Sequence, residues 1–150
     1  KAKNIIMELP KKTPKKPRVI EQKTVFILKY GDKVALRKRV EKGLLQGMYE
    51  FPNVEGHLSE EEALIRIKEM SFLPIRIQQL ENAKHIFSHR EWDMIGYAIR
   101  IDELMDKDQL KEEYIFVEVQ ETKDKYPIPT AFSAYAHYMN INLGNERFEL

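Results

Sequence analysis

The chain has 150 residues, of which 43% are apolar and 33% are charged, and its formal net charge is +1. This length suits one domain, and no apolar run approaches the ~18–20 residues that a membrane-spanning helix needs. The near balance of charge excludes the strong overall field that marks many nucleic-acid-binding proteins. The absence of cysteine excludes disulfides, zinc–thiolate sites and iron–sulfur clusters held by this chain, and a cytoplasmic location is expected.

A basic, proline-rich stretch, KKTPKKPR, occupies positions 11–18. Pro14 and Pro17 restrict the backbone and lack an amide donor, so residues 1–18 are expected to form an extended linker. The linker is either a solvated connector or a basic strap that contacts phosphates by salt-sensitive, sequence-independent attraction. The candidate phosphate contacts in this stretch are Lys11, Lys12, Lys15, Lys16 and Arg18.

The folded part is expected to begin near Val19 with a hairpin. Residues 24–30 and 33–39 are rich in strand-forming side chains, and the Gly-Asp step between them is typical of a tight β-turn. Residues 43–52 then predict a loop followed by a short strand.

A helix is predicted after Gly56. Ser59 is a good N-cap, and Glu62, three residues later, completes the pattern of a capping box. The spacing of three apolar side chains predicts one inward face that packs on a sheet; they are Ala63, Ile67 and Met70.

The second half of the chain returns to strands, which are predicted at 75–81, 84–87, 92–101 and 114–119. Both faces of 92–101 are apolar, which indicates a central strand covered on both sides. A last helix is predicted from Thr130 as its cap, with an inward face of Phe132, Tyr135 and Met139. The predicted class is α/β (α+β), a mixed β-sheet packed between helices, with a folded domain at 19–139 and a C-terminal tail at 140–150.

The sequence HIFSHREW, at 85–92, places polar residues between two predicted strands. A metal site is disfavoured because His85 and His89 are four residues apart in strand and turn, where they do not share a helical face. A Ser88-His89 nucleophile and base is disfavoured because adjacent side chains of an extended chain point apart and no orienting carboxylate is evident. We predict no catalytic residue and no metal ligand, and we expect an exposed loop.

Four motifs carry a resemblance to a known family. GLLQGMYEFPNVEG followed by EEALIRI resembles the strand and loop that lead into the helix of the Nudix fold. With the basic leader, KHIFSHREW and YPIPTAFSAY, the chain resembles the C-terminal domain of the MutY family of adenine DNA glycosylases over most of its length. The resemblance implies a Nudix-like fold.

The resemblance in fold does not extend to the residues that Nudix hydrolysis requires. A hydrolytic Nudix helix carries three glutamates that hold Mg²⁺ against a pyrophosphate. When the helix is aligned on Ala63 and Arg66, these positions hold Ile67, Met70 and Ser71, and of the nearby carboxylates Glu69 remains. One carboxylate does not make such a site, so this chain is expected to be non-catalytic.

The MutY resemblance implies a role in base excision repair, in which the enzyme removes adenine paired with 8-oxoguanine. The glycosidic chemistry and an iron–sulfur cluster belong to an N-terminal domain of that family. The chain, which lacks a starting Met and has no cysteine, is therefore expected to be the recognition half of a bacterial, monomeric enzyme that acts on nucleoid DNA. Its expected partners are double-stranded DNA with an 8-oxoguanine:adenine pair and its own catalytic domain.

The resemblance implies that the turn at Phe87, Ser88 and His89 approaches the 8-oxoguanine strand, so these three residues are the candidate contacts to the oxidised base. Phe87 either stacks on the nucleic acid or plugs the core, and Arg90 is a further candidate phosphate contact. Two other functions remain open: an active Nudix hydrolase of oxidised nucleotides, and a protein-interaction module that binds a clamp or a mismatch-repair factor.

Overall fold

A computed structural model of the chain describes residues 18–39, 45–104 and 114–140. The candidate lysines of the leader and the predicted tail from residue 141 onward lie outside these ranges. Arg18 is the one candidate phosphate contact of the leader that the described residues include.

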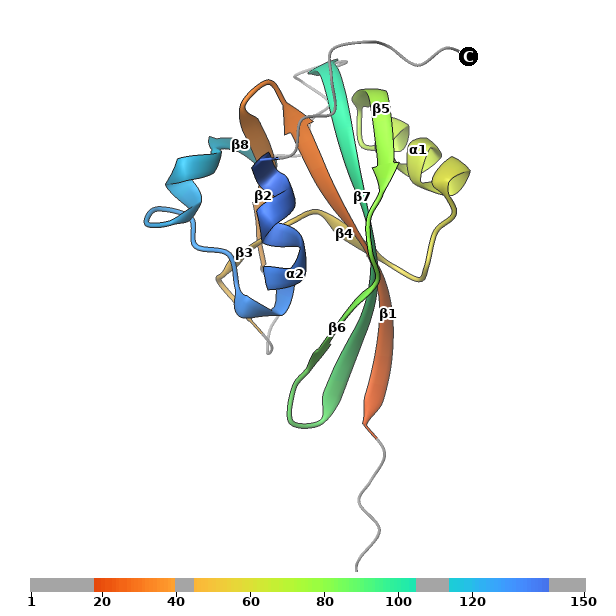
Figure 1. The fold of residues 1–150 in the computed structure, drawn as a ribbon, viewed down its shortest axis with the longest axis vertical. Coiled ribbons are helices and arrows are strands. Elements are labelled where there is room, and N and C mark those ends of the chain that lie inside the picture. Colours follow the sequence, from red (N-terminus) through yellow and green to blue (C-terminus); the bar gives the residue numbers. More distant parts are fainter. Residues whose placement is uncertain (1–17, 40–44, 105–113, 141–150) are drawn as a thin grey trace, which may run out of the picture.

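The described residues form one mixed sheet with helices on both of its faces (Figure 1). The central order is β3-β2-β1-β7-β5, while β4 pairs with β1, β6 with β7 and β8 with β2. The long pair β1–β7 is parallel, and the other pairs are antiparallel. The strands are β1 (Val19–Tyr30), β2 (Lys33–Lys38), β3 (Tyr49–Glu50), β4 (Asn53–Glu55), β5 (Phe72–Gln79), β6 (Ala83–Ile86), β7 (Arg90–Leu104) and β8 (Tyr114–Glu118). The α+β class predicted from the sequence is confirmed.

The predicted hairpin is confirmed, since β1 and β2 pair antiparallel around Gly31, whose φ of 60° suits glycine. β1 begins at Val19 rather than at residue 24, because β7 pairs with it in parallel from Val19 to Lys29. The predicted strand 75–81 begins earlier, at Phe72, and register shifts on both sides of Pro74 accommodate the missing amide donor.

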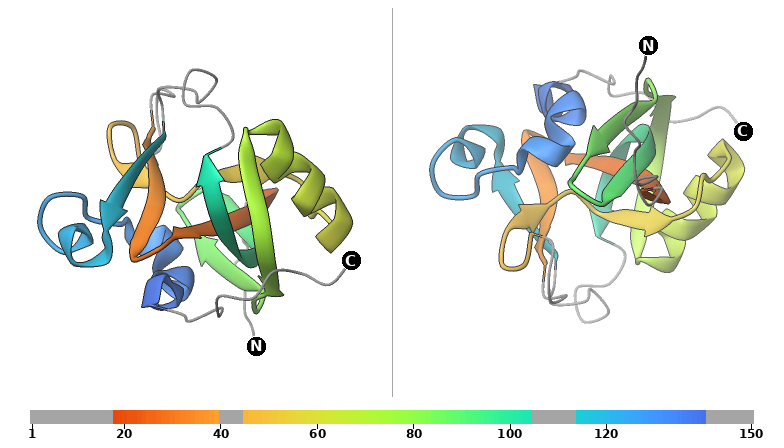
Figure 2. Two further views of the ribbon diagram at one scale, coloured as in Figure 1. Left: turned by 90° about the horizontal axis from the view of Figure 1, so that it is seen from above. Right: turned by 90° about the horizontal axis from the view of Figure 1, so that it is seen from below.

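Alternating side chains of β7 enter two separate cores, which confirms a central strand covered on both faces. Trp92, Met94 and Ala98 belong to one core, together with residues of the C-terminal segment. Tyr97, Ile99 and Ile101 belong to the other core, beneath helix α1 (Glu60–Glu69). Figure 2 shows α1 and the C-terminal helical segment on opposite sides of the sheet.

The start of α1 follows the predicted capping box. The Ser59 hydroxyl accepts a hydrogen bond from the Glu62 amide at 3.2 Å, and the Glu62 carboxylate accepts one from the Ser59 amide at 2.9 Å. Ala63 and Ile67 are buried, while Met70 is half-buried at the C-cap. The capping box therefore satisfies two of the amides at this end of the helix with side chains.

The predicted C-terminal helix is wrong in form, because the segment is a chain of short turns. It consists of η3 (Thr130–Phe132), α2 (Ser133–Ala136) and η4 (His137–Asn140), preceded by η2 (Val119–Thr122). The N-cap is Pro129, so Thr130 already lies inside the first turn and does not cap it. Phe132, Tyr135 and Met139 are nevertheless buried, as predicted. Within the described ranges, no helix is long and apolar enough to cross a membrane.

Candidate nucleic-acid interface

The predicted loop forms the tight connection between β6 and β7. The Phe87 amide donates a hydrogen bond to the Arg90 carbonyl at 2.7 Å, which closes the turn and leaves Ser88 and His89 exposed at its tip. In Figure 1 this hairpin and the start of β1 project together beyond α1 and α2. Ser88 and His89 therefore lie together at the projecting end of the sheet.

The first residues of β1 lie beside the turn. The Val19 amide donates to the His89 carbonyl at 3.1 Å, and the parallel register pairs Val19 with Arg90. Arg18, the residue before the strand, lies 3.6 Å from the Glu91 carboxylate. The end of the predicted linker is thus adjacent to the predicted reading turn, although 70 residues separate the two in sequence (19 to 89).

Phe87 packs against the core. Its half-buried ring lies 5.0 Å from Trp92 and 4.7 Å from His85, both in edge-on arrangements. This packing favours the interpretation in which Phe87 fills space in the core, and it places His85 on the same inner face of the sheet. No group of three or more potential metal-ligating side chains occurs in the part of the chain that the structure describes.

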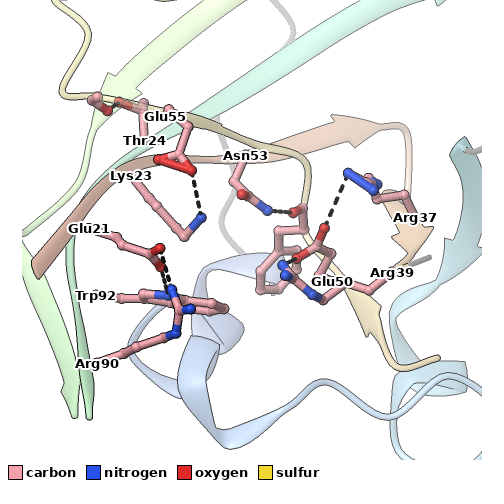
Figure 3. Close-up of polar contacts among 12 residues, drawn as sticks. Glu21, Lys23, Thr24, Arg37, Arg39, Glu50, Asn53, Glu55, Arg90 and Trp92 are labelled. Atoms are coloured by element: carbon pink, nitrogen blue, oxygen red, sulfur yellow. Dashed lines mark hydrogen bonds and ion pairs between the residues drawn. The ribbon is translucent and has the colours of Figure 1, made fainter. Parts of the chain in front are cut away.

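Glu21 connects the turn to the core (Figure 3). Its carboxylate accepts a hydrogen bond from the Trp92 indole at 2.8 Å and another from the Arg90 guanidinium at 2.7 Å. Trp92 is buried, whereas the Arg90 side chain is 50% exposed. Arg90 therefore has an internal partner and still reaches solvent, a position from which a phosphate contact is sterically open.

A second charged cluster surrounds the Trp92 ring, and sequence reasoning missed it. Lys23 and Arg39 lie 4.9 and 5.5 Å from the ring centre. Arg39 also binds the fully buried Glu50 carboxylate at 2.8 Å, and Arg37 lies 3.4 Å from it (Figure 3). A glutamate between Tyr49 and Phe51, in a segment predicted to end in a short strand, was the available signal, because a buried carboxylate requires cationic partners.

The helix positions that hold Mg²⁺ in hydrolytic relatives do not fit a metal in this chain. Ile67 is fully buried in the core, Met70 is half-buried, and Ser71 follows the helix with a φ of 71°. Glu69 is exposed and lies 3.7 Å from Arg66. Thioether, aliphatic and hydroxyl groups at these positions replace the carboxylates that Mg²⁺ prefers.

The Glu62 carboxylate is already hydrogen-bonded to Ser59 at the start of the helix. Hydrogen bonds from the backbone and then the side chain of Ser59 lower the pKa of its carboxyl group. A carboxylate held in a capping box stabilises the start of its helix, and this is the structural role of Glu62.

A family model described as the NUDIX domain matches residues 24–138. Solved structures with the same fold include the C-terminal domain of mouse MUTYH, determined in complex with human PCNA. That domain has a TM-score of 0.61 and 22% identity, with coverage of 83% of this chain and 93% of the other.

Two further solved structures show the same likeness. A MutT NUDIX hydrolase from Burkholderia pseudomallei has a TM-score of 0.57 and 15% identity, covering 79% of this chain and 96% of its own. The E. coli ORF135 protein has a TM-score of 0.55 and 14% identity, covering 82% of this chain and 93% of its own. No curated protein matches the chain. At these identities the structural likenesses show the fold.

Proposed function

The chain belongs to the NUDIX domain family, and from this premise we propose that it is a DNA-recognition module that reads 8-oxoguanine opposite adenine. The observation that carries the proposal is the braced turn at Phe87–Arg90. It holds a hydroxyl and an imidazole at the projecting end of the sheet, and β1 supports it from one side. The side chains that replace the Mg²⁺-binding glutamates in and just after α1 support a role in recognition rather than diphosphate hydrolysis.

The chemistry of the turn suits the altered base. 8-Oxoguanine differs from guanine by an acceptor at O8 and by a donor at N7, and its syn form presents the 2-amino group in the major groove. The Ser88 hydroxyl both donates and accepts, so it can pair with either changed atom. His89 can donate to a base edge or a phosphate, while Phe87 anchors the turn on Trp92.

The proposal includes partners outside this chain. Adenine removal would be the work of a catalytic domain with an iron–sulfur cluster elsewhere in a longer, monomeric bacterial protein. The leader lysines would add sequence-independent phosphate contacts that position the duplex without selecting the base. They are Lys11, Lys12, Lys15 and Lys16, next to Arg18.

A second candidate function is a protein-interaction module. The observation that favours it is the mouse MUTYH C-terminal domain, which shares the fold and is seen in a complex with human PCNA. For this chain, a sliding clamp would be a partner of the same class. Capture of a purified clamp in the absence of DNA would support this role.

The test compares binding of two duplexes, one with 8-oxoguanine:adenine and one with guanine:adenine. Ser88→Ala should reduce the preference for the oxidised duplex by about tenfold, because a good base contact contributes about 1–3 kcal/mol of discrimination. Ser133→Ala, at an exposed serine of α2, is the matched control and should leave the preference unchanged.

Three outcomes would contradict the proposal. One is a Ser88→Ala variant with the wild-type preference, and another is a wild-type chain that binds neither duplex at low salt. The third is Mg²⁺-dependent release of pyrophosphate from 8-oxo-dGTP, which would identify the chain as a hydrolase.

A further inference from the structure

The projecting strands carry a cluster of charges on the face opposite Trp92. Glu91 lies at its centre, with Arg18 at 3.6 Å and Lys84 at 3.4 Å from its two carboxylate oxygens. The Glu91 side chain is only 10% exposed, whereas those of Arg18 and Lys84 are 47% and 58% exposed. The cations are therefore turned to solvent, and the carboxylate that orders them lies beneath.

Two exposed isoleucines flank the same carboxylate. The register places Ile20 of β1 and Ile86 of β6 directly beside Glu91, so all three side chains lie on one face. Ile20 is 60% exposed and Ile86 is 51% exposed. We call this set the Glu91 face; its members are Arg18, Ile20, Lys84, Ile86 and Glu91.

The Glu91 face begins where the cover of α1 ends. The buried residues beneath α1 include Phe26, Leu28 and Tyr97, which lie further along β1 and β7. His57, before the helix, lies 2.8 Å from the Asp93 carbonyl and marks the edge of this cover. Asp93 is the neighbouring acid of the same face, opposite Lys84 in the register, and it is half-buried.

A surface of exposed cations, shielded acids and exposed aliphatic side chains fits a phosphodiester backbone. Ammonium and guanidinium groups pair with phosphates without reading sequence, and methyl groups can pack on deoxyribose. An acidic peptide would satisfy the cations, but the reading turn beside this face favours a nucleic-acid strand. Lys84 and Ile86 directly precede that turn in the same hairpin.

We propose that the Glu91 face binds the DNA backbone next to the base that the turn reads, with Arg18 and Lys84 on phosphates and Ile20 and Ile86 on sugars. This inference rests on the proposed function and extends it to a second surface. The turn selects the base, whereas the Glu91 face contributes affinity that is the same for every sequence.

The test measures the affinity of the chain for both duplexes over a range of salt concentrations. Lys84→Gln should lower the salt slope by about one phosphate contact, so that the fall in affinity between about 50 and about 200 mM salt becomes about 3.5-fold smaller. It should leave the preference for 8-oxoguanine:adenine unchanged. Lys68→Gln, which removes the same charge from the exposed surface of α1, is the matched control and should leave the slope unchanged.

A second variant tests the apolar part without altering charge. Ile86→Ser should weaken binding of both duplexes equally, with the salt slope of the wild type. Because both side chains are more than half exposed, these variants should fold normally.

The outcomes distinguish the two proposals. A wild-type slope for Lys84→Gln, or wild-type affinity for Ile86→Ser, would overturn the Glu91 face even if Ser88→Ala loses its preference. If Ser88→Ala keeps the preference while Lys84→Gln lowers the slope, the face binds DNA and the base-reading function fails. Binding of an acidic peptide, with no binding of DNA, would overturn both.

Discussion

The Trp92 indole donates a hydrogen bond of 2.8 Å to the carboxylate of Glu21, and the same carboxylate accepts one from Arg90. Glu21 lies on β1 and Trp92 on β7, 71 residues apart in the chain. Through this one carboxylate, the buried aromatic core and the exposed turn at Phe87–Arg90 share a support. The position of Ser88 and His89 thus depends on a residue that is remote in sequence.

Substitution of Glu21 should separate two contributions of this support. Glu21→Ala leaves the buried indole donor without a partner and should lower the free energy of unfolding by about 1–3 kcal/mol. Glu21→Gln keeps an acceptor for the indole and loses the exposed ion pair with Arg90, so its cost should stay below about 1 kcal/mol. Chemical denaturation followed by the fluorescence of the only tryptophan of the chain measures both. Equal stability of the two variants would show that the hydrogen bond from the indole contributes nothing to the free energy of unfolding.

Phe87 should act mainly through packing. Phe87→Leu removes the edge-on contact with Trp92, and the free energy of unfolding should fall by about 1 kcal/mol. Affinity for DNA, measured at a temperature where the variant is fully folded, should remain that of the wild type. A loss of affinity without a loss of stability would instead show that Phe87 stacks on the nucleic acid.

A glutamate at the buried Nudix position should be poorly tolerated. Ile67 is fully buried, so Ile67→Glu places a carboxylate in the core and should cost more than about 3 kcal/mol of unfolding free energy. Ile65→Glu, on the same helix at 59% exposure, is the control and should change stability by less than about 0.5 kcal/mol. Thermal denaturation compares the two, and similar melting temperatures would contradict the assigned burial.

Any side chain at position 96, which is occupied by Gly96, should destabilise the fold. A Cβ there would lie 2.6 Å from Cε1 of the buried Tyr135 ring, which cannot move away within a packed core. Gly96→Ala should therefore lower the free energy of unfolding by about 1–3 kcal/mol. In a double-mutant cycle with Tyr135→Leu, the combined loss should be smaller than the sum of the single losses. Simple additivity would show that the two residues do not interact.

The capping box predicts a pH dependence. Because hydrogen bonds lower the Glu62 pKa in the folded chain, its charge stabilises the fold above the ordinary carboxyl pKa, and this contribution disappears as the pH falls through the folded pKa. Wild type should therefore be more stable than Glu62→Gln at neutral pH, and the difference should vanish in acid. Glu61→Gln removes a charge from the same turn without the capping bond and should show a smaller difference. Denaturation at several pH values provides the measurement.

Local patterns were sufficient for much of the fold. Ser59 and Glu62 specify a helix start because a capping box satisfies amides only three residues apart. The two apolar faces of β7 were readable because side chains alternate along a strand. The prediction of a C-terminal helix capped by Thr130 was wrong, because Pro129 occupies the N-cap position and the segment forms short helical turns.

The site required the tertiary structure. Exposure of Ser88 and His89 followed from their position between two predicted strands, and that prediction is local. The parallel pairing of β1 with β7, which brings Val19 to His89 and Glu21 to Trp92, has no local signal, because strand periodicity does not encode the partner strand. Arg18 likewise reaches Glu91 only because β1 pairs with β7, whereas Lys84 meets Glu91 across the local β6–β7 hairpin. Short-range chemistry determines turns, caps and faces, whereas the packing of the whole sheet decides which distant residues meet.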